Sequence, residues 1–217
     1  MKPTLTAALL TGGKSKRMGQ DKGSLRVEGK GVSTFLWERQ VAVLRSVEPD
    51  ELIISGSRKE GYPESVSVVP DRWPDMGPLG GIATCLERLR TDLLLVLAVD
   101  LACIQSEFPR KLLAHTRTGC GVVPIHHNRF EPLVAIYPAT AVGIAIVQLE
   151  KGELVVQRFV ESLMQAGMVT GYNVDPAEEI QLTNWNRPED VMHCLISERR
   201  QPGFFMKNPP GGPKPPL

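Results

Sequence analysis

The chain has 217 residues, enough to bury one well-formed core, and we expect residues 1–200 to form a single domain. Its 25 Lys and Arg residues nearly balance its 24 Asp and Glu residues, so the net charge of +1 excludes an overall field that would attract nucleic acid or an anionic membrane. The short apolar run at the N-terminus soon meets glycines, which predicts neither a signal peptide nor a membrane helix and therefore a cytoplasmic protein.

Apolar runs of strand length alternate along the chain with longer segments of helical period. Strands are expected at residues 5–10, 51–55, 66–69, 93–99, 121–125 and 132–137. Helices are expected at residues 35–47 with a cap at Ser33 or Thr34, at 82–90 after Gly80 and Gly81, and at 140–152, 153–167 and 187–200. This alternation is typical of a mostly parallel sheet with crossover helices, so the sequence predicts a three-layer α/β/α fold of the Rossmann-like kind.

Two other groups of residues carry weaker signals. The four cysteines are scattered through mostly apolar runs, which predicts buried free thiols rather than a disulfide framework or a metal site. His126 and His127 are adjacent near a strand end, and neighbouring strand residues point to opposite faces, so we do not expect them to share a metal ion. Residues 201–217 are rich in Pro and Gly and should form a flexible tail.

A loop rich in glycine and lysine follows the first strand. Gly13-Lys14-Ser15 matches the end of a P-loop, but the first glycine of that motif would fall at Ala8, inside the strand. The dinucleotide fingerprint fails as well, because Gly12 and Gly13 are adjacent and the next glycine is Gly19. A cationic loop at the carboxyl end of a strand still suits an anion in an α/β sheet, and an exposed basic turn is the alternative.

Two aspartates close predicted strands. Asp100 ends the most apolar strand, where a carboxylate would be costly unless it met a cation or good donors, and Mg²⁺ is a natural partner. A strand-end aspartate paired with a lysine is the alternative. Asp71 stands before a turn and a helix N-terminus, and it could equally be a plain loop aspartate.

These segments resemble a known family. The segment "LLTGGKSKRMGQDKGSL" from Leu9 resembles the L-A-G-G-x-S-x-R-M-G-x-D-K signature of the MobA-like nucleotidyltransferases, most closely the molybdenum cofactor guanylyltransferases. Three further matches follow in family order, "DRWPDMGPLGGI" from Asp71, "VDLACI" around Asp100 and "NWNRPEDV" from Asn184. The resemblance covers about residues 5 to 198 and implies the fold of the nucleotide-diphospho-sugar transferases.

The resemblance also implies a reaction, its substrates and its site. GMP would pass from GTP to molybdopterin with release of pyrophosphate, with Mg²⁺ as cofactor and a molybdoenzyme or chaperone as a possible recipient of the product. The implied catalytic residues are Lys22, Asp100 and Arg17, with Asp100 as the metal ligand. The implied nucleotide contacts are Leu10, Thr11, Gly12, Gly13, Lys22, Ser55, Asp71, Gly80 and Asp100, and the implied acceptor contacts are Asn184, Asn186 and Arg158.

Within the family pattern, Gly12-Gly13 favours GTP, because cytidine-using relatives usually carry T-A-A-G at this place. The acceptor side departs from the pattern: the proline of D-x-P is missing after Asp100, Ser55 replaces a common asparagine, Glu131 replaces a common histidine, and the polar or basic pair after G-E is absent. These departures leave open another base or acceptor, such as cytidylyl transfer to molybdopterin or transfer to a sugar phosphate. A non-catalytic subunit that binds guanine nucleotides is a third alternative, against which the intact Lys22 and Asp100 argue.

Overall fold

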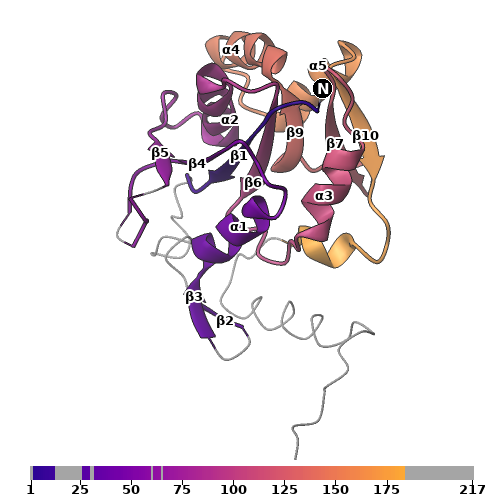
Figure 1. The fold of residues 1–217 in the computed structure, drawn as a ribbon. Helices are drawn as coiled ribbons and strands as arrows, with labels where there is room; N and C mark the ends of the chain where they lie inside the picture. Colours follow the sequence, from indigo (N-terminus) through magenta and orange to yellow (C-terminus); the bar gives the residue numbers. More distant parts are fainter. Residues whose placement is uncertain (1, 13–25, 30–31, 60, 65, 184–217) are drawn as a thin grey trace, which may run out of the picture.

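A computed structural model of the chain describes residues 2–12, 26–29, 32–59, 61–64 and 66–183 (Figure 1). The strands are β1 (Leu5–Leu10), β2 (Arg26–Gly29), β3 (Val32–Phe35), β4 (Glu51–Ser55), β5 (Ser67–Val69), β6 (Leu93–Ala98), β7 (Gly121–His126), β8 (Arg129–Phe130), β9 (Val134–Pro138) and β10 (Val169–Asn173). The helices are α1 (Leu36–Arg45), α2 (Gly77–Arg88), α3 (Glu107–Ala114), α4 (Val142–Glu150) and α5 (Val156–Gln165), with 3₁₀ turns η2 (Ala139–Ala141) and η3 (Glu179–Leu182).

The main sheet is mostly parallel. Its strand order is β10-β7-β9-β6-β1-β4-β5, with β8 paired to β7, while β2 and β3 form a separate hairpin. Only β8 and β9 run against their neighbours among these described strands of the sheet. Because β9 is antiparallel to both β6 and β7, the carboxyl end of β7 lies at the same edge as those of β1, β4 and β6.

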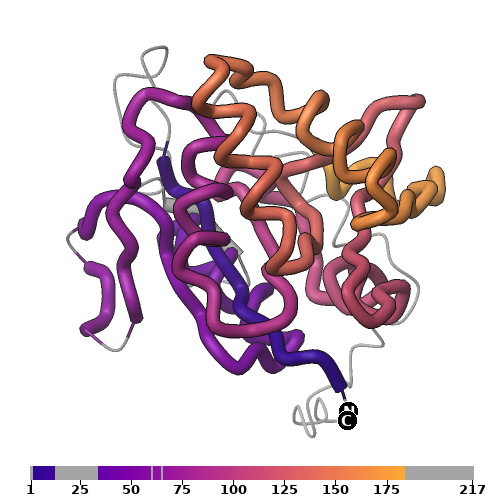
Figure 2. Tube along the Cα trace, turned by 90° about the horizontal axis from the view of Figure 1, so that it is seen from above, coloured from indigo at the N-terminus to yellow at the C-terminus, as the bar shows by residue number. Residues whose placement is uncertain are grey.

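Helices cover both faces of the sheet, which confirms the three-layer prediction. Alternate residues of β1 enter different cores: Ala7 and Leu9 pack with α1 and α3, and Ala8 and Leu10 pack with α2, α4 and α5. The same alternation runs along β6, as a strand covered on both faces requires. In Figure 2 the indigo β1 runs through the interior with other parts of the chain on both sides.

Several boundaries differ from the sequence predictions. Ser33 and Thr34 lie in β3 and do not cap α1, where the Glu38 carboxylate accepts a hydrogen bond from the Phe35 N–H at 2.9 Å instead. Helix α2 begins at Gly77, before Gly80, because Pro78 is accommodated in the first turn. The strands β2, β3, β8 and β10 and the helix α3 were not predicted.

The prediction of free thiols is confirmed for Cys85 and Cys120 but is wrong for Cys103, which is disulfide-bonded. Burial raises the pKa of the Cys85 thiol to about 12, so that thiol is unreactive near neutral pH. Within the described ranges, none of the helices is both long and apolar enough to cross a membrane. The helix expected at 187–200 and the tail expected at 201–217 lie outside the described residues.

Candidate functional site

The ends of β1, β4 and β6 form the centre of the candidate site. Leu10 is opposite Ser55 on one side and Ala98 on the other, so the residues after these strands lie along one edge. The chain proceeds from β1 to β4 and β5 on one side and then returns to β6 on the other. Such a reversal of strand order opens a crevice at the carboxyl edge, where α/β proteins bind their ligands.

Thr11 ties the first two of these strand ends together. Its backbone N–H and its hydroxyl both donate to the Ser55 carbonyl, at 3.1 and 3.0 Å. Gly56 follows with a φ of +134°, and a Cβ added there would lie 2.8 Å from Thr11 Oγ1. The strand end therefore requires glycine at position 56, and the Thr11 N–H is committed to the sheet.

Asp100 is half-buried in the turn that follows β6, next to the end of β1. The Val99 N–H donates to the Leu10 carbonyl at 3.0 Å, which places the start of this turn beside Thr11. Residues 101–104 after Asp100 are all buried. A carboxylate in this position can present hard oxygen ligands to a metal ion at the crevice.

Helix α1 holds the loop behind Asp100. Gln40, which is fully buried, donates from Nε2 to the Leu101 carbonyl at 2.7 Å, and Arg39 donates from Nε to the Ala102 carbonyl at 3.0 Å. These bonds orient the two carbonyls that follow Asp100, in the segment where related sequences carry proline. Neither side chain was singled out from the sequence, because a helix pattern does not indicate which loop the helix will meet.

Asp71 organises the loop that enters α2. Its Oδ1 accepts hydrogen bonds from the Trp73 N–H at 2.9 Å and from the Thr84 hydroxyl at 3.0 Å. Gly80 is buried beneath this loop, where a Cβ would lie 2.7 Å from the Trp73 carbonyl oxygen. Both residues thus shape the start of α2 in the structure, and their contact with a nucleotide stays a prediction.

Leu10 and Ser55 lie under the edge, against α2. Leu10 is 7% exposed and Ser55 3%, and a Cβ added at Gly81 would lie 3.6 Å from Leu10 Cδ2 and 3.5 Å from Ser55 Oγ. The Ser55 hydroxyl lowers the pKa of the Cys85 thiol, but burial outweighs it and raises that pKa. Gly12, by contrast, is exposed, and a Cβ there would meet no atom of the described residues within 4 Å.

A cavity of about 280 Å³ lies on the far half of the sheet, and Leu101, the residue after Asp100, is part of its lining. Its lining combines the loop after β6 with the β7–β8 hairpin and α5, through Leu101, His126, His127, Arg129, Phe130, Glu131, Pro132, Leu133 and Gln157. Gln157 fixes the hairpin, since its side-chain amide bonds both the N–H and the carbonyl of Phe130 at 3.2 and 2.7 Å. Burial raises the pKa of Glu131, although the charges of His126 and Arg129 partly oppose this.

The two histidines of this cavity differ from their predicted arrangement. His126 ends β7, but His127 and Asn128 have φ values of +47° and +59° and form the two-residue turn to β8. The turn brings the two imidazole rings to a centroid separation of 4.0 Å. The prediction that they point apart is therefore wrong, because His127 is not a strand residue. An asparagine after the histidines, between two apolar runs, was the available signal for a tight hairpin.

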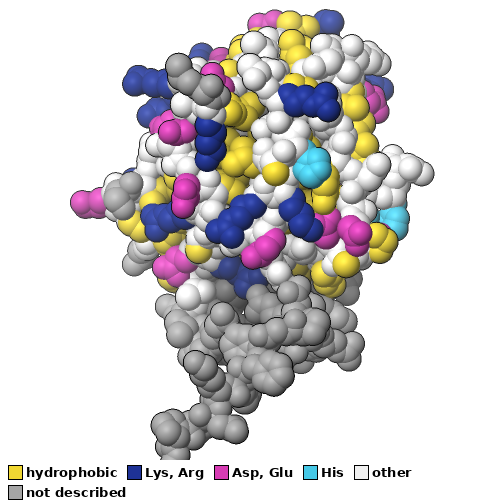
Figure 3. Space-filling view, turned by 45° about the vertical axis from the view of Figure 1, so that its right-hand side comes forward, with side chains coloured by type: hydrophobic (Ala, Val, Ile, Leu, Met, Phe, Trp, Pro, Cys, Tyr) yellow, Lys and Arg dark blue, Asp and Glu magenta, His cyan; other side chains and the backbone are white. Residues whose placement is uncertain are grey.

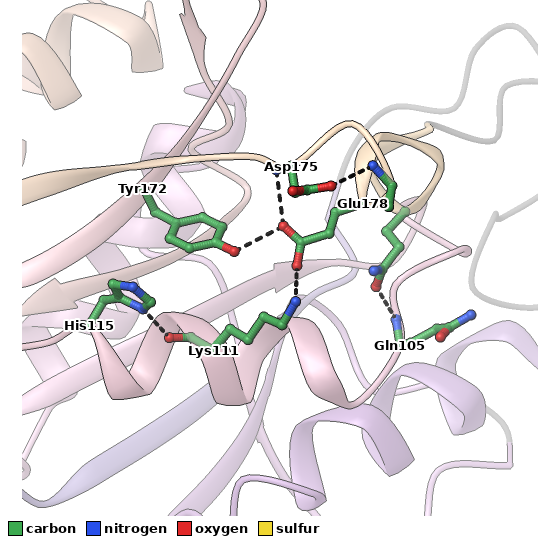
Figure 4. A network of polar contacts seen from close by, with 8 residues as sticks. Gln105, Lys111, His115, Tyr172, Asp175 and Glu178 are labelled. Atoms are coloured by element: carbon green, nitrogen blue, oxygen red, sulfur yellow. Dashed lines mark hydrogen bonds and ion pairs between the residues drawn. The ribbon is translucent and has the colours of Figure 1, made fainter. Parts of the chain in front are cut away.

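The segment after β10 is fixed by the network in Figure 4. Glu178, with a side chain only 6% exposed, accepts hydrogen bonds from Lys111, from the Tyr172 hydroxyl at 2.9 Å and from the Asp175 N–H at 3.2 Å. Burial alone would raise the pKa of Glu178, but these donors and the Lys111 charge outweigh it and lower that pKa. The ionised Glu178 thus anchors the start of η3 to α3 and β10.

Of the remaining predicted site residues, one lies next to the cavity lining and the others lie outside the described residues. Arg158 is exposed on α5, next to Gln157 of the cavity lining. Gly13, Arg17, Lys22, Asn184 and Asn186 lie outside the described residues. On the face shown in Figure 3, Lys and Arg are interspersed with Asp and Glu, so its described part has no continuous field of one sign.

Comparison with known proteins gives a consistent picture. Residues 7–169 match the MobA-like NTP transferase domain. The chain is 36% identical over 190 residues to a probable molybdenum cofactor guanylyltransferase of Opitutus terrae, with 86% of this chain and 92% of that protein covered. It is 29% identical over 195 residues to a probable molybdenum cofactor guanylyltransferase of Flavobacterium johnsoniae, with 89% and 98% covered.

Solved structures show the same fold. The molybdopterin-guanine dinucleotide biosynthesis protein A of Archaeoglobus fulgidus matches with a TM-score of 0.65 at 21% identity, over 90% of this chain and 100% of that chain. The 2-C-methyl-D-erythritol 4-phosphate cytidylyltransferase of Thermus thermophilus matches with a TM-score of 0.64 at 14% identity, over 88% and 98%. This architecture is thus shared with a cytidylyltransferase, so the choice of base depends on residues of the site and not on the fold.

Proposed function

Because this chain belongs to the MobA-like NTP transferase family, we propose that it transfers GMP from GTP to molybdopterin and releases pyrophosphate. The observation that carries the proposal is the position of Asp100. It lies in the turn after β6, beside the end of β1, and the next residue, Leu101, lines the cavity of about 280 Å³. The chain is a nucleotidyltransferase of the MobA type, and in the proposal the nucleotide binds at the strand ends and the acceptor in this cavity.

In the proposed reaction, a phosphate oxygen of the acceptor attacks the α-phosphorus of GTP. A new bond forms between that oxygen and the α-phosphorus, and the bond from the α-phosphorus to the bridging oxygen of pyrophosphate breaks. Transfer at phosphorus depends mainly on in-line positioning and on stabilisation of charge. The loop from Leu10 to Gly13 and the cations Arg17 and Lys22 would hold the nucleotide, as the family resemblance implies.

The donor set at the site fits Mg²⁺. Asp100 supplies a half-buried carboxylate at the crevice, and Mg²⁺ is usually held by one or two carboxylates together with phosphate oxygens of the substrate. Bound Mg²⁺ would neutralise charge on the triphosphate and on the leaving pyrophosphate. The chain's own contribution is to hold the Asp100 carboxylate in place through the loop that Gln40 and Arg39 fix.

The acceptor is the less constrained part of the proposal. The cavity lined by Leu101 contains Arg129 and two histidines as groups that can attract an anion, and it also contains the carboxyl of Glu131. Arg158, Asn184 and Asn186 would complete the acceptor site if the family pattern applies to them. Transfer of the product to a molybdoenzyme or its chaperone is part of the same proposal.

The test is turnover with α-labelled GTP or CTP, with molybdopterin or a sugar phosphate as acceptor, and with or without Mg²⁺. We expect Mg²⁺-dependent formation of the guanine dinucleotide and of pyrophosphate. We expect Asp100→Asn to lower kcat by about 10²- to 10³-fold, because a charge at the reacting phosphates is lost. Glu150→Gln, an exposed carboxylate at the end of α4, is the matched control and should leave turnover unchanged.

Each alternative has its own outcome in this assay. Product formation only from CTP would overturn the assignment of the base, and product formation only with a sugar phosphate would overturn the assignment of the acceptor. Nucleotide binding without turnover under any combination would indicate the non-catalytic subunit. A normal rate for Asp100→Asn would remove Asp100 from the catalytic residues.

A further inference from the structure

We propose that His126, His127 and Glu179 form a binding site for one Zn²⁺ ion. The three side chains offer two imidazole nitrogens and a carboxylate oxygen, and these ligand atoms all lie within 4.8 Å of one another. Two histidines and one glutamate are a known ligand set for zinc with a fourth position left open. The site is separate from Asp100, which is suited to Mg²⁺ because it supplies oxygen only.

The distances around Glu179 fit a metal ion better than hydrogen bonds. His126 Nε2 lies 3.8 Å from Glu179 Oε1, and His127 Nε2 lies 3.9 Å from Glu179 Oε2. Both separations are too long for a hydrogen bond. In a tetrahedral zinc site, bonds of about 2.0–2.1 Å place neighbouring ligand atoms roughly 3.3 Å apart. The three ligand atoms, which lie within 4.8 Å of one another, would therefore have to approach by up to about 1.5 Å to satisfy the coordination.

His126 has the features of a ligand that lacks its ion. Its Nε2 is inaccessible to water and makes no hydrogen bond to any described residue. Its other nitrogen, Nδ1, lies 3.8 Å from Glu131 Oε1. Because Nδ1 and Nε2 each lie 3.8 Å from a carboxylate oxygen, the contacts alone favour neither tautomer, and a bound ion would select the one that has its proton on Nδ1 and its lone pair on Nε2. A buried nitrogen of this kind costs free energy unless something occupies the position in front of it.

Both structural elements that supply the ligands are held in place. The two-residue turn at His127 and Asn128 joins β7 to β8, and Gln157 clamps the hairpin through Phe130. Glu179 directly follows Glu178, which the network of Figure 4 fixes to α3 and β10. Ligands on such constrained segments lose little conformational freedom when they bind an ion.

The test is Zn²⁺ binding to the full chain, after treatment with a chelator and in the presence of excess Mg²⁺, measured by isothermal titration calorimetry. We expect one Zn²⁺ per chain. The variants His127→Ala and Glu179→Gln should each weaken binding at least about tenfold. Their matched controls are His115→Ala, an exposed histidine after α3, and Glu161→Gln, an exposed carboxylate on α5, and both should bind like the wild type.

A Co²⁺ titration gives a second readout that does not depend on enzymatic activity. Intense visible absorption indicates a four-coordinate ion, and it should be lost in His127→Ala and kept in His115→Ala. The proposal is overturned if the wild type binds no Zn²⁺, or if His127→Ala and Glu179→Gln bind it with unchanged affinity. Both readouts measure metal binding directly, so a failure of GTP turnover leaves this test intact even though the two histidines also line the cavity proposed for the acceptor.

Discussion

Gln40 shows how one buried side chain supports the residue proposed to hold the metal of the nucleotide site. Its Nε2 donates to the Leu101 carbonyl at 2.7 Å, one residue after Asp100. We expect Gln40→Leu to lower the free energy of unfolding by about 1–3 kcal/mol, because a buried carbonyl loses its donor. We also expect kcat to fall more than KM rises, because the turn that carries Asp100 loses its support.

Chemical denaturation and steady-state kinetics of Gln40→Leu test this expectation. Arg45→Ala, on the exposed side of the same helix, is the control and should change stability by less than about 0.5 kcal/mol. Equal stability of the Gln40 variant and the wild type would mean that another group holds the loop. A normal kcat in a destabilised variant would separate loop support from catalysis.

At the scale of elements, the network around Glu178 joins α3, β10 and η3 and makes their association depend on pH. The folded-state pKa of Glu178 lies below its ordinary value of 4.5, so its ionised form contributes stability above about pH 4.5. That contribution is lost as the pH falls through the lowered folded-state pKa. We expect Glu178→Gln to be less stable at neutral pH and to lose stability less steeply with acid.

The measurement is the free energy of unfolding of wild type and variant between pH 7 and pH 3. Glu161→Gln is the control, since that carboxylate is exposed on α5 and should leave the acid limb of the curve unchanged. A Glu178→Gln curve parallel to that of the wild type at every pH would contradict the assignment. The acid dependence would then come from other carboxylates.

The elements that the sequence could predict are those whose pattern reflects burial. β1 and β6 are buried at every position because both faces are covered, and apart from Thr6 they are apolar, so the positions of these strands were predicted closely. β10 was missed because Gly171 interrupts its pattern. A Cβ at that position would lie 2.4 Å from Ile125 Cδ1, so Ile125 on the neighbouring strand would have to change its side-chain conformation to admit any other residue. α3 was missed because it is short and carries Pro109 in its first turn.

The site was predictable only in part, for a related reason. Asp100, Thr11 and Ser55 follow parallel strands, and parallel strands bring their carboxyl ends to one edge whatever else the chain does. Gln40 meets the loop after Asp100, and Glu179 meets the two histidines, through tertiary packing for which no local pattern exists. The roles of Arg17, Lys22, Asn184 and Asn186 stay predictions from the family resemblance.

At the scale of the whole molecule, nucleotide binding should raise the melting temperature, because a ligand that binds only the folded chain raises its free energy of unfolding. At a GTP concentration of 100 times Kd the gain is about 2.7 kcal/mol, or roughly 5–10 °C in Tm for a chain of this size. Thermal unfolding with GTP, CTP, ATP and UTP, each with and without Mg²⁺, measures it. We expect the largest shift with GTP and Mg²⁺.

Asp100→Asn provides the control for this measurement, because it should lose the part of the shift that Mg²⁺ adds and keep most of the remainder. A larger shift with CTP would contradict the assignment of guanine to Gly12-Gly13. Equal increases in Tm with all four nucleotides would mean that the site binds the triphosphate and does not distinguish the bases.

The reversed direction of β9 changes which parts of the sequence can evolve acceptor preference. Since β9 runs against β6 and β7, the site-facing edge receives the residues that precede β9, from Glu131 to Leu133, as well as those that follow β6 and β7. These residues are contiguous with the β7–β8 hairpin and are far in sequence from the loop at the end of β1. If this cavity binds the acceptor as proposed, substitutions between residues 126 and 133 would change the acceptor without altering the residues proposed to bind the nucleotide, and the two specificities would evolve independently.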